Sequence, residues 1–429
     1  MQKILTELKK KENSGDKICI ALIGCGQMGS SIVTVSDNYP GLDVRLVADL
    51  EVEKGIEVFE EIGYKRDQIK ICNQRDKAQK ALEKGKVVVT EDAYLSGKIP
   101  AIDTIVEATG STEVGAKVAY KAILQQKHII MLNVETDVTV GWLLKNMADR
   151  AGVVYTVSAG DEPGAVMELY RLARTMGFQV TALGKGKNNP VDYYVTPEDV
   201  KEEAKDKEMN PKMLCAFIDG TKTMVEMAEV SNATGALPDL PGMHGPKVDK
   251  EDLNKKFIPK RDGGIFNNDF VVDYSTGKVS PGVFVIFTTD SEHLKQNLSF
   301  YSMGEGPYYT LFRPYHLCSI ETPVSVARAC ITGEHTINSE EFNSEVAAIA
   351  KRDLSEGDVV QGIGSKDVFG RTYSYKEAQE KNTLPLGVSQ NCKLKNEINK
   401  GELITYDDVE LDSNSFVVKL RGIQDSLKD

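Results

Sequence analysis

Apolar residues in the first third of the chain form short runs that are separated by amphipathic stretches. Residues 18–23 (ICIALI) are almost wholly apolar, without alternation. Similar runs follow at 44–49, 102–108, 128–132 and 152–157. Such runs are typical of parallel strands buried on both faces, and 113–126 has the spacing of a helix between two of them. This alternation predicts an α/β fold with an N-terminal Rossmann domain, a doubly wound parallel sheet.

The pattern changes twice after residue 158. Residues 159–345 are richer in Gly, Pro and charge, and 271–289 has two apolar runs with a turn at 275–278, which indicates an α+β substrate domain. Residues 346–429 have short strand patterns and no long helical one, which indicates a small β-rich domain. We therefore expect three domains, with the first over residues 1–158.

Composition narrows the class of partner. The 429 residues carry a formal net charge of −12, which argues against nucleic acid and anionic membranes but leaves room for a small anionic substrate. The seven cysteines are scattered and form no CxxC pair, as in a protein with reduced thiols. No stretch has the ~18 consecutive apolar residues of a membrane span, and the N-terminus lacks a signal-peptide pattern. The expected location is the cytoplasm.

A GxGxxG motif follows the first strand and opens a helix, with Gln27 and Met28 between its last two glycines. Gly24 permits a tight turn, Gly26 lets a pyrophosphate approach the backbone, and Gly29 lets the helix lie close to the strand. The motif therefore predicts an NAD or NADP site at the helix N-terminus. The alternative is a glycine turn of an unrelated α/β protein.

Other residues extend the predicted cofactor site. Asp49 ends the next strand, where a carboxylate can accept from a ribose 2′-hydroxyl, which favours NAD slightly over NADP. The small residues after the strand at 102–108 suit a chain segment beside the nicotinamide ribose, although a helix cap at Ser111 or Thr112 explains the same phrase. We expect cofactor contacts from these positions and from the end of the following strand: Ala108, Thr109, Gly110 and Asn133.

Several short segments of the middle region contain ionisable residues that could take part in catalysis or ligand binding. Asp161 and Glu162 follow a strand, where they could ligate Mg²⁺ or Mn²⁺ or act as acid and base, or simply begin a helix. Lys185 and Lys187 alternate in GKGK, so both ammonium groups could meet one anionic substrate or a developing alkoxide; a solvated basic loop is the alternative.

Histidine and arginine candidates come later in the chain. His244 lies between glycine-containing pairs, in a loop unsuited to burying a ring, and we expect it to bind the substrate. His316 follows Arg313 closely and precedes Glu321 by five residues. Arg313 could clamp a carboxylate or phosphate and His316 could move a proton, whereas a lone histidine is more often structural.

The sequence resembles homoserine dehydrogenase in two segments, GCGQMG at 24–29 and DTIVEATGST at 103–112. It is more similar to homoserine-dehydrogenase-like proteins with a C-terminal SAF (β-clip) domain, a group that includes 1-deoxy-D-xylulose 5-phosphate reductoisomerase-like enzymes. The phrases that carry this resemblance are MLNVETDVTVG (131–141), AGDEPGA (159–165), GKGK (184–187), DGTKTMVEMA (219–228), GMHGP (242–246) and FRPYHLCSIETPVSVA (312–327).

The resemblance implies roles that spacing alone does not. Lys222 and Glu226 could be an ordinary i,i+4 ion pair worth about 0.3–0.5 kcal/mol, and the resemblance makes them catalytic candidates. It also implies a divalent metal for a hydroxyketone substrate, with Asp161, Glu162 and Glu321 as ligands. One departure matters: homoserine dehydrogenases have an Asn-Lys pair where this chain has Asn133 followed by Val134, so homoserine is an unexpected substrate.

Two functions from different classes follow. The first is an NAD(P)-dependent oxidoreductase of a small anionic polyol or hydroxyketone. The reaction that the resemblance implies is the rearrangement of 1-deoxy-D-xylulose 5-phosphate and its reduction by NADPH to 2-C-methyl-D-erythritol 4-phosphate. The alternative is another hydroxy substrate of a homoserine-dehydrogenase-type enzyme. The second is a dinucleotide-binding regulatory protein without catalysis. The resemblance implies a homodimer or homotetramer for the enzyme.

Overall fold

The computed structural model describes residues 2–427, and the chain forms two compact units. The first unit combines Met1–Asp161, Leu317–Asn338 and Asn414–Asp429. The second combines Glu162–His316 and Ser339–Ser413. The chain therefore passes more than once between the units, where the sequence led us to expect three consecutive domains.

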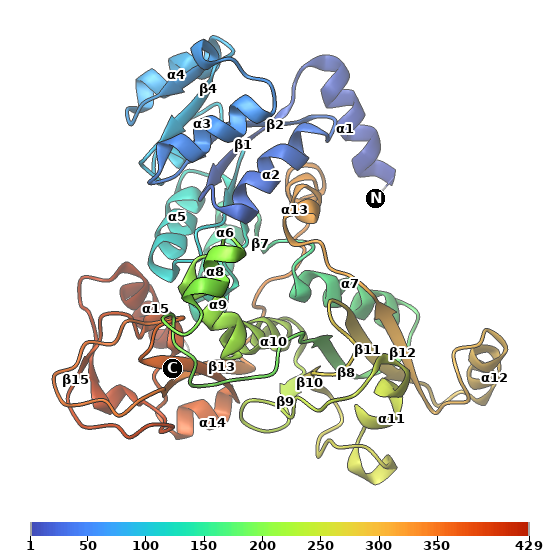
Figure 1. Ribbon diagram of the computed structural model, residues 1–429. Coiled ribbons are helices and arrows are strands. Elements are labelled where there is room, and N and C mark those ends of the chain that lie inside the picture. The colour runs from blue at the N-terminus through green and yellow to red at the C-terminus, as the bar shows by residue number, and fades with distance from the viewer. Residues whose placement is uncertain (1, 428–429) are drawn as a thin grey trace. The chain divides into compact units, whose positions relative to one another are not determined.

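A seven-stranded sheet forms the centre of the first unit (Figure 1). Its strands lie in the order β3-β4-β2-β1-β5-β6-β7, and every pairing is parallel. Because the chain leaves β1 toward β2 on one side and later enters β5 on the other, the strand order reverses between β1 and β5. The predicted doubly wound parallel sheet is confirmed. The strands are β1 (Ile18–Ile23), β2 (Leu42–Ala48), β3 (Ile69–Ile71), β4 (Val87–Thr90), β5 (Thr104–Glu107), β6 (His128–Met131) and β7 (Tyr155–Val157).

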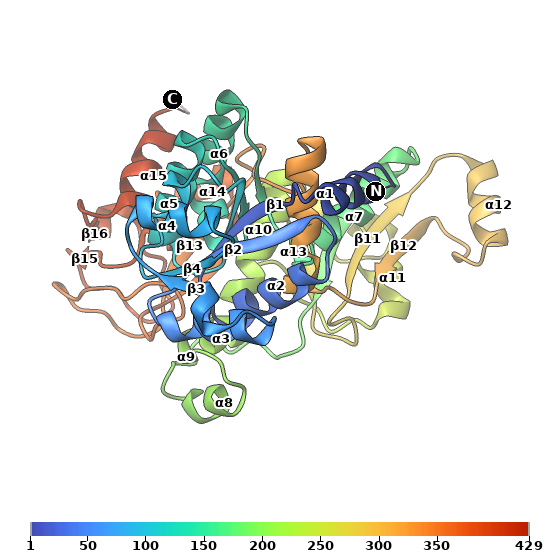
Figure 2. The same ribbon diagram turned by 90° about the horizontal axis from the view of Figure 1, so that it is seen from above.

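Helices cover both faces of this sheet (Figure 2). Right-handed crossovers place α2 (Gln27–Asp37) and α3 (Val52–Glu61) on one face, and α5 (Thr112–Leu124) and α6 (Val134–Ala151) on the other. The strands between them are almost fully buried, as their apolar runs predict. The remaining helices of the first 161 residues are α1 (Gln2–Ser14) and α4 (Arg75–Glu83). Within residues 2–427, every helix is too short or too polar to cross a bilayer.

Two later segments complete the first unit. Helix α13 (Cys318–Ala327) packs on α2, and the C-terminal helix α15 (Phe416–Ser426) packs on α5 and α6. The carboxylate of Glu113 accepts hydrogen bonds from the backbone N–H groups of Phe416 (3.0 Å) and Val417 (2.9 Å) at the start of α15. A carboxylate at a helix N-terminus satisfies free N–H groups and complements the helix dipole, so Glu113 fixes the start of α15 on this unit.

The second unit has a five-stranded mixed sheet in the order β12-β11-β8-β10-β9. Strand β8 pairs in parallel with β10 and antiparallel with β11. The two strands expected within 271–289 are therefore present, but they flank β8 and do not pair with each other. The strands are β8 (Gln179–Gly186), β9 (Leu237–Pro238), β10 (Val271–Ser275), β11 (Val283–Thr288) and β12 (Tyr308–Arg313).

Helices α7 (Glu162–Thr175) and α10 (Thr221–Thr234) pack on this sheet, and α9 (Pro211–Ile218) packs on α10. Alternate residues of β8 face opposite ways. A Cβ on Gly184 would lie 2.4 Å from the Phe284 ring, whereas Lys185 reaches residues of α7 and α10. Short helices α8 (Lys201–Asp206) and α11 (Leu253–Lys256) lie in the long connections.

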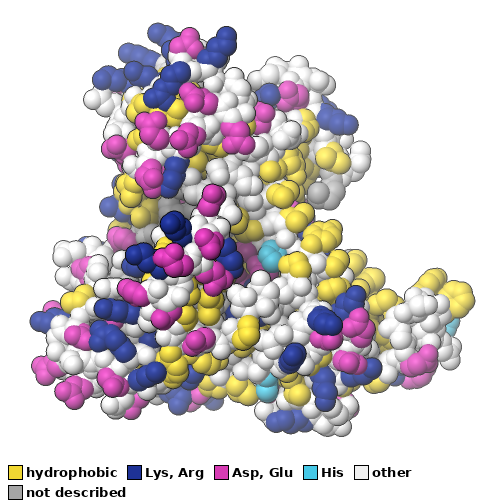
Figure 3. All heavy atoms as spheres, in the orientation of Figure 1, with side chains coloured by type: hydrophobic (Ala, Val, Ile, Leu, Met, Phe, Trp, Pro, Cys, Tyr) yellow, Lys and Arg dark blue, Asp and Glu magenta, His cyan; other side chains and the backbone are white. Residues whose placement is uncertain are grey.

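The rest of the second unit is β-rich, as expected. Strands β13 (Ser344–Ala350) and β14 (Val368–Ser374) pair antiparallel and pack on α10, and α14 (Tyr375–Glu380) follows them. Strands β15 (Lys393–Leu394) and β16 (Val409–Glu410) form a second small antiparallel pair. Helix α12 (Glu292–Phe300) is an arm between β11 and β12, and Figure 3 shows hydrophobic side chains at its end.

A buried ion pair ties the residue after β13 to the end of α9. The Lys351 ammonium lies 2.7 Å from Oδ2 of Asp219 and also donates to the carbonyl oxygens of Val195 (2.9 Å) and Ser365 (3.0 Å). Both charged side chains are almost completely buried. Removal of one member of such a pair leaves an uncompensated buried charge.

We expect Lys351→Met to lower the free energy of unfolding by about 3 kcal/mol, because Asp219 then stays buried without its cation. Urea unfolding followed by circular dichroism measures the change. Lys207→Met is the matched control, since the Lys207–Glu203 pair is half exposed and is worth less than about 1 kcal/mol. Adding Asp219→Asn to Lys351→Met removes the unpaired charge, so the double variant should regain most of the lost free energy of unfolding. Equal free energies of unfolding in the single and double variants would contradict this account.

Candidate functional site

The glycine turn after β1 has two glycines that the protein itself requires. Gly24 has a φ of +91°, and a Cβ there would lie 2.9 Å from the backbone of Ala108. A Cβ on Gly29 would lie 2.0 Å from the carbonyl oxygen of Gly24. Gly26 differs, because its φ is −75° and no atom of the described residues lies within 4 Å of the position that a Cβ would take. The protein alone gives no steric reason for glycine at 26.

The residues around this turn fit a dinucleotide. Gly26 is the N-cap of α2 and supplies no side-chain cap, so the N–H groups of the first turn can meet a phosphate. Asp49 directly follows β2, and its carboxylate accepts from the N–H groups of Cys25 (2.6 Å) and Glu51 (2.8 Å). Asp49 therefore orders the glycine turn from the next strand. The open space at Gly26 is the room that a pyrophosphate needs.

The ends of β5 and β6 carry the other expected cofactor residues. Glu107 accepts from the Thr109 N–H (3.0 Å) and hydroxyl, and the Ser111 hydroxyl accepts from the first turn of α5. The helix-cap alternative at Ser111 is thus present in the structure. Asn133 is buried; its Oδ1 accepts from the Thr136 N–H (3.1 Å) and its Nδ2 donates to the Ser111 carbonyl (2.9 Å). Asn133 therefore holds two loops of the site together.

Glu107 is a buried carboxyl that sequence reasoning did not select. Burial raises the pKa of Glu107 to about 7, helped by the nearby charge of Glu135 and opposed by hydrogen bonds from Thr109 and Asn133. A folded-state pKa above the unfolded value means that the folded protein binds the proton more tightly. The free energy of unfolding therefore falls as pH rises from the unfolded pKa of about 4.5 through about 7.

We expect Glu107→Gln to flatten this pH dependence, because the amide keeps an oxygen for the Thr109 donors but has no proton to lose. At pH values above the folded pKa the variant should be more stable than the wild type by up to about 3 kcal/mol, and below pH ~5 the difference should vanish or reverse. Urea unfolding across this range measures it. Parallel pH profiles for the two proteins would contradict the assignment.

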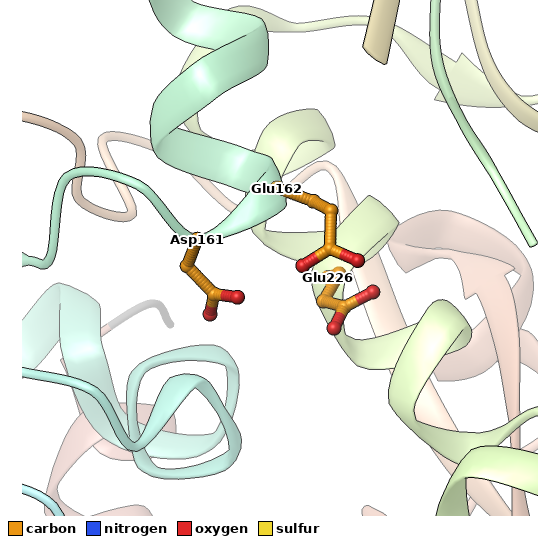
Figure 4. Close-up of side chains that lie close together, drawn as sticks. All are labelled: Asp161, Glu162 and Glu226. Atoms are coloured by element: carbon orange, nitrogen blue, oxygen red, sulfur yellow. The ribbon is translucent and has the colours of Figure 1, made fainter. Parts of the chain in front are cut away.

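In the second unit, Lys185 lies between two glutamates. Its ammonium donates to Oε1 of Glu162 (2.5 Å), the first residue of α7, and to Glu226 on α10. All three side chains are nearly buried, and the Glu162 and Glu226 carboxylates face one another (Figure 4). The structure thus brings together three candidate residues from three separate elements.

The ionisation of this cluster follows from its burial and charges. Burial alone would lower the pKa of Lys185, but the attraction of Glu162 and Glu226 outweighs it and raises the pKa above the usual value. Burial and the charge of Glu162 raise the pKa of Glu226, against the attraction of Lys185 and Lys222. Lys185 is therefore a fixed positive charge.

Lys187 has a different environment on the same strand end. Its ammonium is buried and donates to the Phe217 carbonyl oxygen of α9 (2.8 Å). Burial first, and then repulsion by Lys185, lower the pKa of Lys187 to about 8, although Glu226 and Asp219 oppose the shift. A lysine with this pKa can both give and take a proton near neutral pH.

His316 joins the cluster from the end of the segment after β12. Its Nε2 lies 3.6 Å from Oε2 of Glu162, and its Nδ1 lies 2.9 Å from the Pro281 carbonyl oxygen. The Pro281 carbonyl oxygen can only accept a hydrogen bond, so Nδ1 carries a hydrogen, and in a neutral ring Nε2 is the nitrogen without one. Glu162 thus has both Lys185 and His316 beside it.

The metal ligands expected from the sequence belong to both units. Asp161 ends the first unit one peptide bond before Glu162, and Glu321 lies on α13 of the first unit. The carboxylate that accompanies Glu162 within the second unit is Glu226, with oxygens of the pair within 4.8 Å. Because Lys185 already donates to both carboxylates, the pair as it stands fits an ammonium ion and not a divalent metal.

Two further candidates have other partners. His244 Nδ1 lies 2.9 Å from Oδ2 of Asp273, and its Nε2 lies 3.5 Å from Asp239. Asp273 also accepts from the backbone N–H of His244, so this histidine closes a loop onto β10. Arg313 lies 3.0 Å from the Glu168 carboxylate and stacks on the Tyr315 ring. Substrate binding by His244 or Arg313 stays a prediction.

Comparison with known proteins gives one family match. Residues 160–322 match the family model "Oxidoreductase DRL, catalytic domain". This segment contains the Lys185 cluster, so the middle of the chain is similar to the catalytic domain of an oxidoreductase, as the sequence led us to expect. No curated protein matches the chain. The SAF domain and the likeness to homoserine dehydrogenase stay predictions.

Solved structures are only distantly similar. A probable dehydrogenase from Thermotoga maritima is 12% identical with a TM-score of 0.44, covering 75% of this chain and 91% of its own. GenD2 from gentamicin A biosynthesis, in complex with NAD, is 14% identical with a TM-score of 0.33, covering 69% and 72%. DOX-P reductoisomerase in complex with magnesium is 16% identical with a TM-score of 0.35, covering 49% and 56%. Similarities as weak as these do not indicate which activity the protein has.

Proposed function

We propose that the protein is an NAD(P)-dependent oxidoreductase of a small anionic hydroxyketone or polyol. The observation that carries this proposal is the buried cluster of Glu162, Lys185 and Glu226, with the half-buried His316 and the buried Lys187 beside it, in the segment that matches an oxidoreductase catalytic domain. Burial of so many ionisable groups costs stability, and such groups concentrate where a protein performs acid–base chemistry.

The residues have separable roles in this reaction. A nicotinamide dinucleotide supplies or accepts the hydride, and the glycine turn with Asp49 holds it. Lys187 gives a proton to the carbonyl oxygen that becomes the alcohol, or takes it in the reverse direction. Lys185 stabilises negative charge on that oxygen, because two carboxylates keep it protonated. The Asp49 carboxylate favours NAD, since it would repel a 2′-phosphate.

The substrate we propose first is 1-deoxy-D-xylulose 5-phosphate, which the resemblance of the phrases at 159–165 and 184–187 implies. In that reaction a retro-aldol and aldol rearrangement precedes the hydride transfer, and the product of the reduction by NADPH is 2-C-methyl-D-erythritol 4-phosphate. The hydroxyketone and phosphate of the substrate suit a site with several lysines. Another phosphorylated or carboxylated hydroxyketone has the same chemistry, and we propose a cytoplasmic homo-oligomer in either case.

The test is to mix the full-length protein with NADH or NADPH and a panel of phosphorylated and carboxylated hydroxyketones, and to follow the absorbance of the reduced nicotinamide. We expect oxidation with at least one anionic compound and none with its neutral analogue. Dinucleotide binding without turnover across the panel, in both directions, would instead identify a dinucleotide-binding regulatory protein.

A further inference from the structure

The Lys185 ammonium occupies the place between two carboxylates where a bound cation would lie. It donates to Glu162 and to Glu226, and its side chain is only 7% exposed. An ammonium group has three N–H donors. Two are used by the carboxylates, so one remains for an oxygen of another molecule.

The backbone on both sides of Lys185 is closely packed. Gly184 and Gly186 flank it on β8, and Cβ atoms on them would lie 2.5 Å from the Asp273 carbonyl oxygen and 2.0 Å from the Ser280 nitrogen. The strand is therefore packed as closely as glycine allows on the side away from the carboxylates. A shift of β8 toward that side would bring backbone atoms into collision.

The charges also argue against a second cation at the pair. Glu162 and Glu226 supply two negative charges, while Lys185 supplies one positive charge directly and Lys222 attracts Glu226 one turn before it on α10. A divalent ion would have to displace the ammonium or lie against it. At a separation of a few ångströms and in a nearly buried site, that repulsion is large.

We propose that Lys185 is a tethered cation that occupies the Glu162–Glu226 carboxylate pair in place of a divalent metal. The pair is thus a cation site whose resident ligand is part of the chain. Its third N–H is directed to the substrate oxygen, a step that rests on the proposed function; occupation of the pair does not.

The test uses Mn²⁺ as the probe and the electron paramagnetic resonance of free Mn²⁺ as the readout. We expect Lys185→Ala to bind one Mn²⁺ at least about tenfold more tightly than the wild type, because two carboxylates then face an open place without a competing positive charge. Adding Glu226→Gln to Lys185→Ala should abolish the gain. Lys187→Ala is the matched control, since that lysine lies two residues away with a carbonyl partner, and it should gain no site.

Three outcomes overturn the proposal. One is a folded Lys185→Ala protein that binds Mn²⁺ no better than the wild type. Another is an equal gain in Lys187→Ala. The third is that Mn²⁺ raises the thermal unfolding midpoint of the wild type and does not raise that of Glu162→Gln, a result that requires only that both proteins fold. None of these readouts requires turnover, so they are independent of whether the protein is an oxidoreductase.

Discussion

Gly26→Val should lower the affinity for NADH or NADPH by about 100-fold or more and leave the fold intact. The turn gives the Cβ of residue 26 free space and a φ of −75°, which valine adopts without strain. Among residues 2–427 no atom lies within 4 Å of that Cβ, so the collision we expect is with a pyrophosphate that approaches the start of α2. Titration of the protein into reduced dinucleotide, followed by fluorescence, measures the affinity, and thermal unfolding measures the fold.

Gly29→Val is the matched comparison. Its Cβ would lie 2.0 Å from the Gly24 carbonyl oxygen, so this variant should lose thermal stability as well as binding. The two variants separate a glycine needed by the ligand from a glycine needed by the helix. Unchanged dinucleotide affinity in a folded Gly26→Val protein would show that this turn binds no dinucleotide.

The first unit could be predicted largely from the sequence because its signals are local. The first two apolar runs, the glycine turn and the acidic residue after β2 lie within residues 18–49, and each depends on backbone geometry near its own position. The segments 317–338 and 414–429 join this unit by contacts such as Glu113 with the start of α15. Nothing in the local pattern of either segment indicates such a partner.

The cluster in the second unit was predictable as a set of residues but not as an arrangement. The sequence indicates Lys185, Glu226 and Glu162 as candidate residues in three separate segments. Helical spacing predicts that Glu226 pairs with Lys222 on its own helix, whereas in the structure Glu226 pairs with Lys185 of β8. Helical spacing is visible in a sequence, whereas the packing of α7 and α10 on β8 is not. The carboxylate pair is therefore a product of the tertiary fold.

Two buried groups escaped selection for a related reason. Glu107 ends a strand whose other residues are apolar, and an acid in that position carries no sign that it is fully buried. Asp219 accepts a hydrogen bond from the Thr221 N–H at the start of α10, a local role, but its charged partner Lys351 is more than a hundred residues away in the sequence. A buried charge is recognisable only once its partner and its surroundings are known.

Lys187→Met should lower kcat of the proposed reaction by about 100- to 1000-fold, the usual effect of losing a general acid. The pKa of Lys187 is lowered to about 8 by burial and by the charge of Lys185, so its ammonium form disappears as pH rises through that value. The rate of carbonyl reduction by the wild type should therefore fall above pH ~8, and this limb should be absent from the residual rate of the variant. Steady-state kinetics across pH, with the anionic substrate found in the panel, measures both.

Lys187→Arg distinguishes proton transfer from charge. Arginine keeps the positive charge near the substrate but does not release its proton in this pH range. We therefore expect Lys187→Arg to retain much of the KM for an anionic substrate while kcat stays as low as in Lys187→Met. A kcat of Lys187→Arg equal to that of the wild type would show that Lys187 acts through its charge alone. An unchanged kcat and pH profile in Lys187→Met would show that the proton comes from another group, and His316 beside Glu162 would then be the residue to substitute.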